Sequence, residues 1–140
     1  MKGSIEMKFG VLKDIKNGEY RVVATPAEVS LIAGDGHEVY VASKAGYAAG
    51  FDDKEYAAAG ATMATNEEIW AICDFVAKVK EIEPSEYDLM REGQMIFCCI
   101  HPAAHREEVD ALLEKKVIAI TAEDSHRYGS PNCEAAGKAG

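Results

Sequence analysis

The chain has 140 residues, of which 48% are hydrophobic, and this length and composition suit a single domain with a buried core. Its formal net charge of −9 would repel polyanions, which argues against nucleic acids and anionic membranes as partners. The chain has no run of about 20 apolar residues that could span a bilayer, and its first residues lack the apolar centre of a secretion signal, so a cytoplasmic protein is expected.

The first two expected elements have clear boundaries in the sequence. Residues 7–12 form an apolar run that predicts a strand. Thr25, Pro26 and Glu28 then predict the start of a helix, because threonine can cap free amides, proline suits the first helical position and glutamate can complete a capping box. This helix should end at the glycine-containing turn 34–36.

Short apolar runs continue to alternate with helical segments along the rest of the chain. Further strands are expected at residues 37–42, 61–64, 75–79, 94–100 and 117–121. Further helices are expected at residues 52–59, 107–116 and 134–140, with Val109, Leu112 and Leu113 on one side of the second of these. Another helix should begin at the capping box of Thr65 and Glu68, and a short one should run from a cap at Ser85 through Met90. This alternation predicts an α/β fold: a Rossmann-like or flavodoxin-like parallel sheet of about six strands, with helices on both faces and residues 1–140 in one domain.

Cysteines and glycines suggest neither a disulfide framework nor a ligand site of a standard type. Cys98 and Cys99 are neighbours in an expected strand, so their side chains should point to opposite faces and act as reduced packing residues. Cys98, His101 and His105 can ligate metals, but their spacing matches no standard zinc pattern, and no metal site is predicted. No G-x-G-x-x-G or Walker-type run is present, which predicts no nucleotide site in this chain.

Four ionisable residues stand near the carboxyl ends of expected strands, where parallel sheets bind ligands: Arg21, Lys80, His101 and Glu123. Arginine offers a planar fork that matches a carboxylate, lysine a compact charge for the carboxylate or an adjacent carbonyl oxygen, and histidine a proton near neutral pH. Glu123 could orient one of the cations. Each residue alone would fit a solvated surface position, but their coincidence at one edge favours a site for a small 2-oxo or 2-amino acid.

Many segments of the chain resemble alanine dehydrogenases and the related transhydrogenase α subunits. The segments are MKFGV (7–11), NGEYRV (17–22), ATP (24–26), HEV (37–39), GFDD (50–53), AAGA (58–61), KVKE (78–81), REGQ (91–94) and LLEKKV (112–117). Together they extend the resemblance from about residue 7 to residue 138.

The resemblance implies roles for the residues at the expected sheet edge. Arg21 and Lys80 would hold the carboxylate and carbonyl of pyruvate or L-alanine, His101 would be the acid/base, and Glu123 would support the pocket. Transhydrogenase α subunits lack the lysine and the histidine, so Lys80 and His101 favour the dehydrogenase branch. The sequence departs from the family at Ile82 and Pro102, where proline and leucine are usual.

The family pattern continues with a Rossmann domain that binds NAD, and this chain ends before it. Residues 132–140 would begin the interdomain helix, and Asn132 and Cys133 stand where the family places residues near the cofactor. Because the hydride comes from the cofactor, the chain alone is expected to bind no NAD and to be inactive.

Three hypotheses follow from these patterns. The first is the substrate domain of an NAD-dependent L-alanine dehydrogenase-like oxidoreductase, which acts with a partner that carries the nucleotide domain. The second is a non-catalytic module that binds a small 2-oxo or 2-amino acid. The third is a truncated remnant, whose small residues near the end of the chain would favour homo-oligomers.

Overall fold

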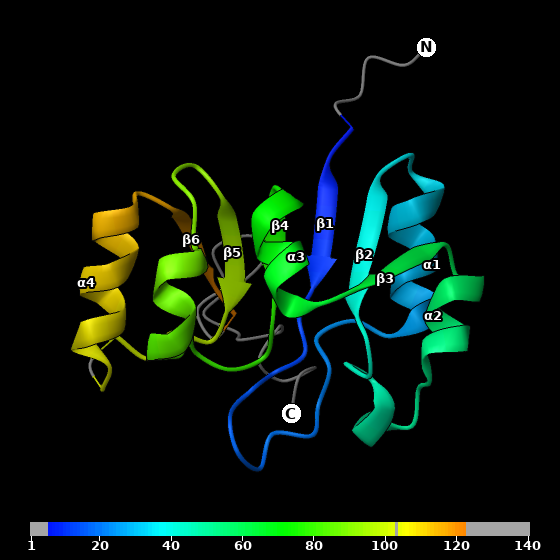
Figure 1. Ribbon diagram of the computed structural model, residues 1–140, viewed down its shortest axis with the longest axis horizontal. Helices are drawn as coiled ribbons and strands as arrows, with labels where there is room; N and C mark the ends of the chain where they lie inside the picture. The colour runs from blue at the N-terminus through cyan, green and yellow to red at the C-terminus, as the bar shows by residue number, and fades with distance from the viewer. Residues whose placement is uncertain (1–5, 103, 123–140) are drawn as a thin grey trace, which may run out of the picture.

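The computed structural model describes residues 6–102 and 104–122, which form a parallel sheet in the order β3-β2-β1-β4-β5-β6 (Figure 1). The strands are β1 (Lys8–Val11), β2 (Glu38–Ala42), β3 (Ala61–Ala64), β4 (Phe75–Ala77), β5 (Met95–Cys98) and β6 (Ile118–Thr121). The parallel six-stranded α/β sheet that the sequence predicts is confirmed. Its strand order reverses between β1 and β4, which makes this a Rossmann-type arrangement with a switch point at its centre.

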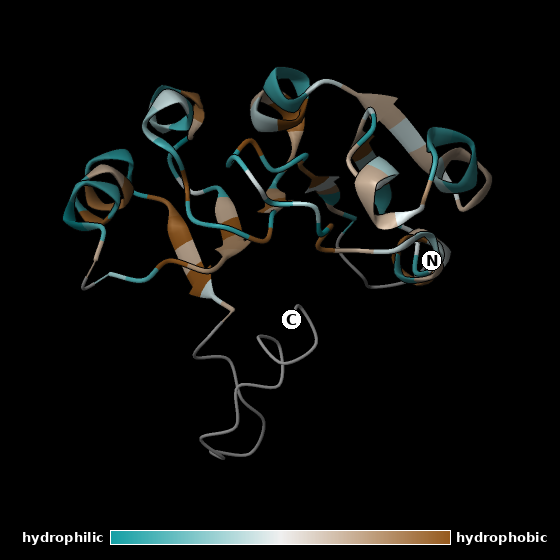
Figure 2. Ribbon diagram, turned by 90° about the horizontal axis from the view of Figure 1, so that it is seen from below, coloured by the Kyte–Doolittle hydropathy of each residue, from teal (hydrophilic) through white to brown (hydrophobic). Residues whose placement is uncertain are grey.

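Helices lie on both faces of the sheet, as expected. They are α1 (Pro26–Gly34), α2 (Asp53–Ala58), α3 (Asn66–Ile72) and α4 (Arg106–Lys115), with 3₁₀ turns η1 (Tyr47–Ala49) and η2 (Pro84–Leu89). Figure 2 shows α3, η2 and α4 on one side of the sheet and α1 on the other. Among the described residues, none of the helices has both the length and the apolar character needed to cross a membrane.

Both predicted capping boxes are present. The backbone N–H of Thr25 donates to Oε1 of Glu28 at 2.8 Å, at the start of α1. At the start of α3, the N–H of Glu68 donates to the Thr65 hydroxyl at 3.1 Å, and the N–H of Thr65 donates to Oε1 of Glu68 at 3.0 Å. These local hydrogen bonds satisfy amides that a helix cannot satisfy itself, which explains why both helices begin where the sequence indicates.

The fourth strand is shorter than predicted. It ends at Ala77 instead of residue 79, because the following N–H groups on the side of β1 form no further backbone hydrogen bonds with that strand. The N–H groups of Val79 and Lys80 donate instead to the carboxylate of Asp14. Lys78, expected inside the strand, therefore lies just beyond it.

Two predictions about helices are wrong. Ser85 does not cap η2, which follows Glu83 and has Pro84 at its first position. Leu113 does not share the inner side of α4, since it is 72% exposed while Leu112 is 8% exposed. The buried side of α4 instead carries Glu108, Ala111 and Leu112, which are three and four residues apart and so lie on one face.

Candidate functional site

The loops that follow β1, β4 and β5 meet at one edge of the sheet, where these parallel strands end (Figure 1). Three of the residues singled out by sequence, Arg21, Lys80 and His101, lie in these loops. Glu123, Asn132 and Cys133 lie outside the described residues, as does the expected helix at 134–140.

Asp14 joins the loop after β1 to the segment after β4. Its Oδ2 accepts the N–H of Val79 and its Oδ1 accepts the N–H of Lys80, each at 3.0 Å. Burial raises the pKa of Asp14, although the two amide donors and the ammonium of Lys78 act in the opposite direction. The carboxylate thus binds the backbone immediately before the Lys80 side chain.

Lys78 and Glu86 form a buried ion pair beside this connection. The Nζ of Lys78 lies 2.7 Å from Oε1 of Glu86 and 4.0 Å from Oδ1 of Asp14, and the lysine side chain is completely buried. Oε1 of Glu86 also accepts the N–H of Glu83 at 2.9 Å. Sequence reasoning missed this pair, although a lysine within the apolar run 75–79 was a visible signal.

Arg21 is held by Glu19 through a bidentate pair. Nε and Nη2 of the guanidinium each donate to a different oxygen of the Glu19 carboxylate at 2.9 Å, and the Arg21 backbone N–H adds a third bond. These bonds lower the pKa of Glu19 to about 2, with a further contribution from the charge of Lys80. The cations of Arg21 and Lys80 therefore act on the same carboxylate, and Arg21 also interacts electrostatically with Cys99 and Asp14.

Removing the guanidinium should release the Glu19 carboxyl. In an Arg21→Ala variant, we expect the pKa of Glu19 to rise from about 2 toward its ordinary value of 4.5, as measured by NMR titration of the side-chain carbon. Because the folded pKa is depressed, the pair stabilises the fold above pH 4.5, and this contribution is lost as the pH falls through about 2.

Asp53 supplies the control for that titration. A hydrogen bond from the Ser43 hydroxyl lowers the pKa of Asp53, and Arg21 is not among the groups that shift this pKa. The pKa of Asp53 should be the same in both proteins, and a Glu19 pKa that stays at about 2 without the arginine would contradict the pairing.

His101 occupies a left-handed backbone conformation with φ of 52°, directly before Pro102. Its carbonyl accepts the N–H groups of Ala104 at 3.0 Å and His105 at 3.2 Å, which closes a tight turn into α4. A non-glycine residue in this region costs on the order of 1–2 kcal/mol, and such residues concentrate at functional sites. The exposed imidazole has its ring centroid 6.3 Å from that of His105.

His105 connects this turn to Glu81 and Lys16. Its Nε2 lies 3.6 Å from Oε1 of Glu81, and the ammonium of Lys16 donates to the same oxygen. Burial alone would raise the pKa of Glu81, but the hydrogen bond from Lys16 and the nearby positive charges outweigh it and lower the pKa. The loops that follow β1, β4 and β5 are therefore joined by a continuous series of polar contacts, which ends at His101.

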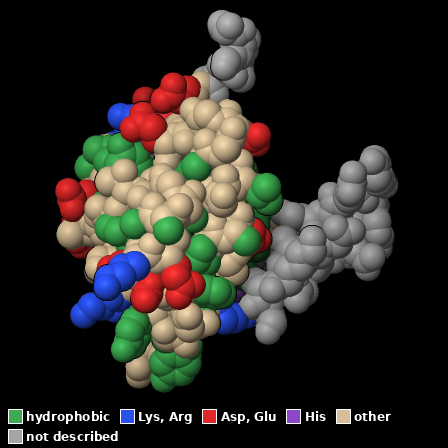
Figure 3. Space-filling view, turned by 90° about the vertical axis from the view of Figure 1, so that its right-hand side faces the viewer, with side chains coloured by type: hydrophobic (Ala, Val, Ile, Leu, Met, Phe, Trp, Pro, Cys, Tyr) green, Lys and Arg blue, Asp and Glu red, His purple; other side chains and the backbone are tan. Residues whose placement is uncertain are grey.

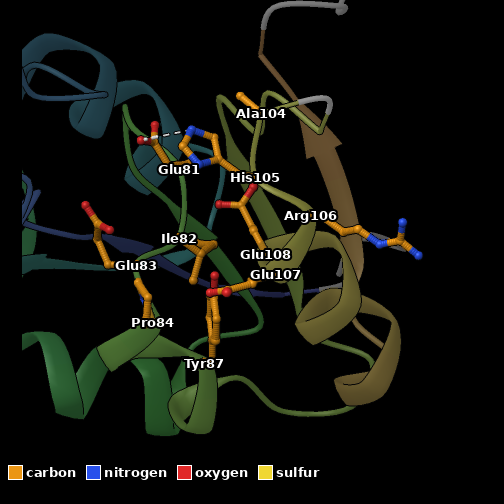
Figure 4. Close-up of a pocket in the computed structure, with 10 residues that line it drawn as sticks. All are labelled: Glu81, Ile82, Glu83, Pro84, Tyr87, Ala104, His105, Arg106, Glu107 and Glu108. Carbon is orange, nitrogen blue, oxygen red and sulfur yellow. Dashed lines mark ion pairs between the residues drawn. The ribbon is translucent and has the colours of Figure 1, made fainter.

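A cavity of about 410 Å³ lies beside these polar contacts, between η2 and α4 (Figure 4). Its polar lining is mostly acidic and includes Glu81, Glu83, Glu107 and Glu108. Burial raises the pKa of Tyr87 in its wall, and Glu108, Glu107 and Glu83 raise it further. This negative potential disfavours an anionic ligand, so the cavity does not suit the acid that Arg21 and Lys80 would bind.

Figure 3 shows acidic side chains around the rim of the face formed by α1 and α2, together with lysine and arginine side chains, most of them at its lower left. Within residues 6–102 and 104–122, no group of three or more histidine, cysteine, aspartate or glutamate side chains is arranged to hold a metal ion. Cys73, Cys98 and Cys99 form no disulfide bond with one another.

Strand order and connections define a doubly wound α/β domain of Rossmann type, with cationic side chains at its carboxyl edge. Residues 10–130 match the model of the family described as alanine dehydrogenase/PNT, N-terminal domain, and the chain belongs to this family. The family identified from the sequence motifs is thereby confirmed.

Several alanine dehydrogenases are similar to this chain. The enzyme of Methanococcus maripaludis is 42% identical over 118 residues, which cover 84% of this chain and 32% of the relative. That of Bilophila wadsworthia is 46% identical with similar coverage of 84% and 31%, and one from Mycobacterium tuberculosis is 37% identical, covering 94% and 38%. The chain thus spans about a third of the length of these relatives.

Solved structures agree with this assignment. A structure of L-alanine dehydrogenase superposes with a TM-score of 0.84 at 38% identity, covering 89% of this chain and 35% of that one. A transhydrogenase from Sinorhizobium meliloti superposes with a TM-score of 0.81 at 23% identity, covering 87% and 36%, and this likeness concerns the fold alone.

Proposed function

We propose that this chain is the substrate-binding domain of an NAD-dependent L-alanine dehydrogenase-like oxidoreductase, which interconverts L-alanine and pyruvate. The observation that carries the proposal is the position of Arg21 and Lys80 in the loops that follow the neighbouring strands β1 and β4, with the Arg21 guanidinium held by the Glu19 carboxylate. Two cations gathered at a switch point suit a small anionic substrate. The similarity to alanine dehydrogenases selects a 2-oxo or 2-amino acid.

Each residue has a defined role in this proposal. Arg21, oriented by Glu19, binds the substrate carboxylate through its planar guanidinium. Lys80 binds the carbonyl oxygen and stabilises the negative charge that develops on it when ammonia adds to the carbonyl carbon, before that oxygen leaves as water and the resulting imine is reduced. His101 exchanges the proton at that oxygen, since imidazole titrates near neutral pH. Glu123, which follows β6 in the sequence, supports these groups.

The fold of this chain does not suit a dinucleotide, although its strand order is of Rossmann type. In dinucleotide-binding domains, a short glycine-rich turn between the first strand and helix holds the pyrophosphate. Here residues 12–25 connect β1 to α1, and this loop carries the carboxylates of Asp14 and Glu19. NAD, which supplies the hydride, would therefore bind to a separate nucleotide-binding domain, with Asn132 and Cys133 as contacts from this chain.

Substitutions at the two cations test the proposed site. We expect the chain to bind pyruvate in calorimetric titration, and Arg21→Met or Lys80→Met to weaken binding at least tenfold, about 1.4 kcal/mol, because each removes a charge-assisted contact. Lys13→Met is the matched control, since Lys13 is an exposed lysine of the same loop. Absence of pyruvate binding, or equal losses in all three variants, would contradict the proposal.

A second measurement separates an enzyme domain from a binding module. When the chain is mixed with a nucleotide-binding domain of an alanine dehydrogenase, the proposed function predicts NADH oxidation that requires both pyruvate and ammonium. Binding of pyruvate without any such oxidation would favour the non-catalytic module.

A further inference from the structure

The backbone direction at Lys80 is set by a side chain and not by the sheet. In a strand, successive N–H groups point to opposite neighbours. Here the successive N–H groups of Val79 and Lys80 both donate to Asp14, each at 3.0 Å. The chain must therefore turn at this point, and the Asp14 carboxylate determines where Lys80 leaves the sheet.

Asp14 is well suited to hold a fixed position. Its side chain is 2% exposed, it lies on the same loop as Arg21, and the ammonium of Lys78 lies 4.0 Å from its Oδ1. The segment it holds is bound a second time by Glu86, which contacts the Lys78 ammonium and the Glu83 N–H. The backbone around Lys80 is thus anchored on both sides.

We propose that Asp14 is a positioning residue that places the Lys80 ammonium opposite Arg21, so that the pocket recognises the 2-oxo group of its substrate as well as the carboxylate. This inference rests on the proposed function. Asp14 touches no substrate and acts only through the two amides. Replacing the Asp14 carboxylate should therefore lower the ratio between the affinity for a 2-oxo acid and the affinity for the same acid without the carbonyl. A general loss of stability would not change this ratio.

The experiment compares pyruvate with propionate in calorimetric titrations of the full chain. In Asp14→Asn the amide Nδ2 replaces one acceptor oxygen and cannot accept a backbone N–H. We expect affinity for pyruvate to fall about tenfold and affinity for propionate to fall much less, so that the preference for pyruvate decreases at least fivefold. Asp14→Glu, which keeps the charge facing Lys78 but shifts the carboxylate, should fold and show an intermediate loss of preference.

Asp74→Asn is the matched control. Oδ2 of Asp74 accepts the N–H of Lys8 at 3.0 Å and so also links the β1 and β4 segments, but at the opposite edge of the sheet. This variant should lower stability and leave the preference for pyruvate unchanged. If the wild-type chain binds pyruvate and the Asp14 variants keep its preference, the inference is overturned while the proposed function stands. If the wild type binds neither acid, both fall together.

Discussion

Lys78→Met is expected to lower the free energy of unfolding by about 3–5 kcal/mol, the typical cost of removing one partner from a buried ion pair. The lysine is completely buried, and its ammonium lies 2.7 Å from Glu86 and 4.0 Å from Asp14. Without it, the buried carboxylates of Asp14 and Glu86 lose the positive charge beside them. Oε2 of Glu86 has no hydrogen-bond partner among the described residues. Once the ammonium is removed, the Glu83 N–H is the donor that remains to this carboxylate among those residues.

Urea unfolding followed by tryptophan fluorescence measures this effect, since Trp70 is buried. Lys115→Met is the control, because Lys115 pairs at 3.7 Å with Asp88, whose side chain is 99% exposed, and such surface pairs contribute about 0–1 kcal/mol. Adding Glu86→Gln to Lys78→Met should recover part of the loss by removing one unpaired charge. A Lys78 variant as stable as the Lys115 variant would show that the buried pair is energetically unimportant.

Gly10→Ala is expected to destabilise the domain by about 3 kcal/mol, at the upper end of the usual cost of overpacking. A Cβ at this position on β1 would lie 2.3 Å from Cγ2 of Ile69 and 2.9 Å from Sγ of Cys73, both completely buried on the α3 side. The branched Ile69 side chain cannot move away, so α3 itself would have to shift away from the sheet.

Gly34→Ala is the control for the packing argument. A Cβ at Gly34, in the last turn of α1, would meet nothing within 4 Å, and alanine is the better helix former. This variant should be as stable as wild type or up to about 1 kcal/mol more stable in the same denaturation assay. Equal stability of the Gly10 and Gly34 variants would contradict the close contact between β1 and α3.

Sequence alone determined most of the elements of this protein and the edge at which two of its candidate site residues, Arg21 and Lys80, lie. Capping boxes at Thr25 and Thr65 are made by residues three positions apart, so the local pattern is sufficient to place α1 and α3. Alternation of strands and helices requires parallel strands, and parallel strands bring their carboxyl ends to a common edge. The positions of Arg21 and Lys80 after two such strands are therefore sufficient to group them at that edge.

Tertiary structure decided how those residues are held. Asp14 and Val79 are 65 residues apart, and their contact depends on β1 and β4 being neighbours, which only the strand order establishes. The same contact ends β4 early and moves Lys78 out of the strand into a buried ion pair. Hydrophobic periodicity reports which residues are buried against an element, but it carries no information about which distant polar groups meet. For this reason the sequence predicts the cations of the candidate site, and only the folded chain shows that Glu19 bonds the Arg21 side chain and that Asp14 bonds the Lys80 backbone.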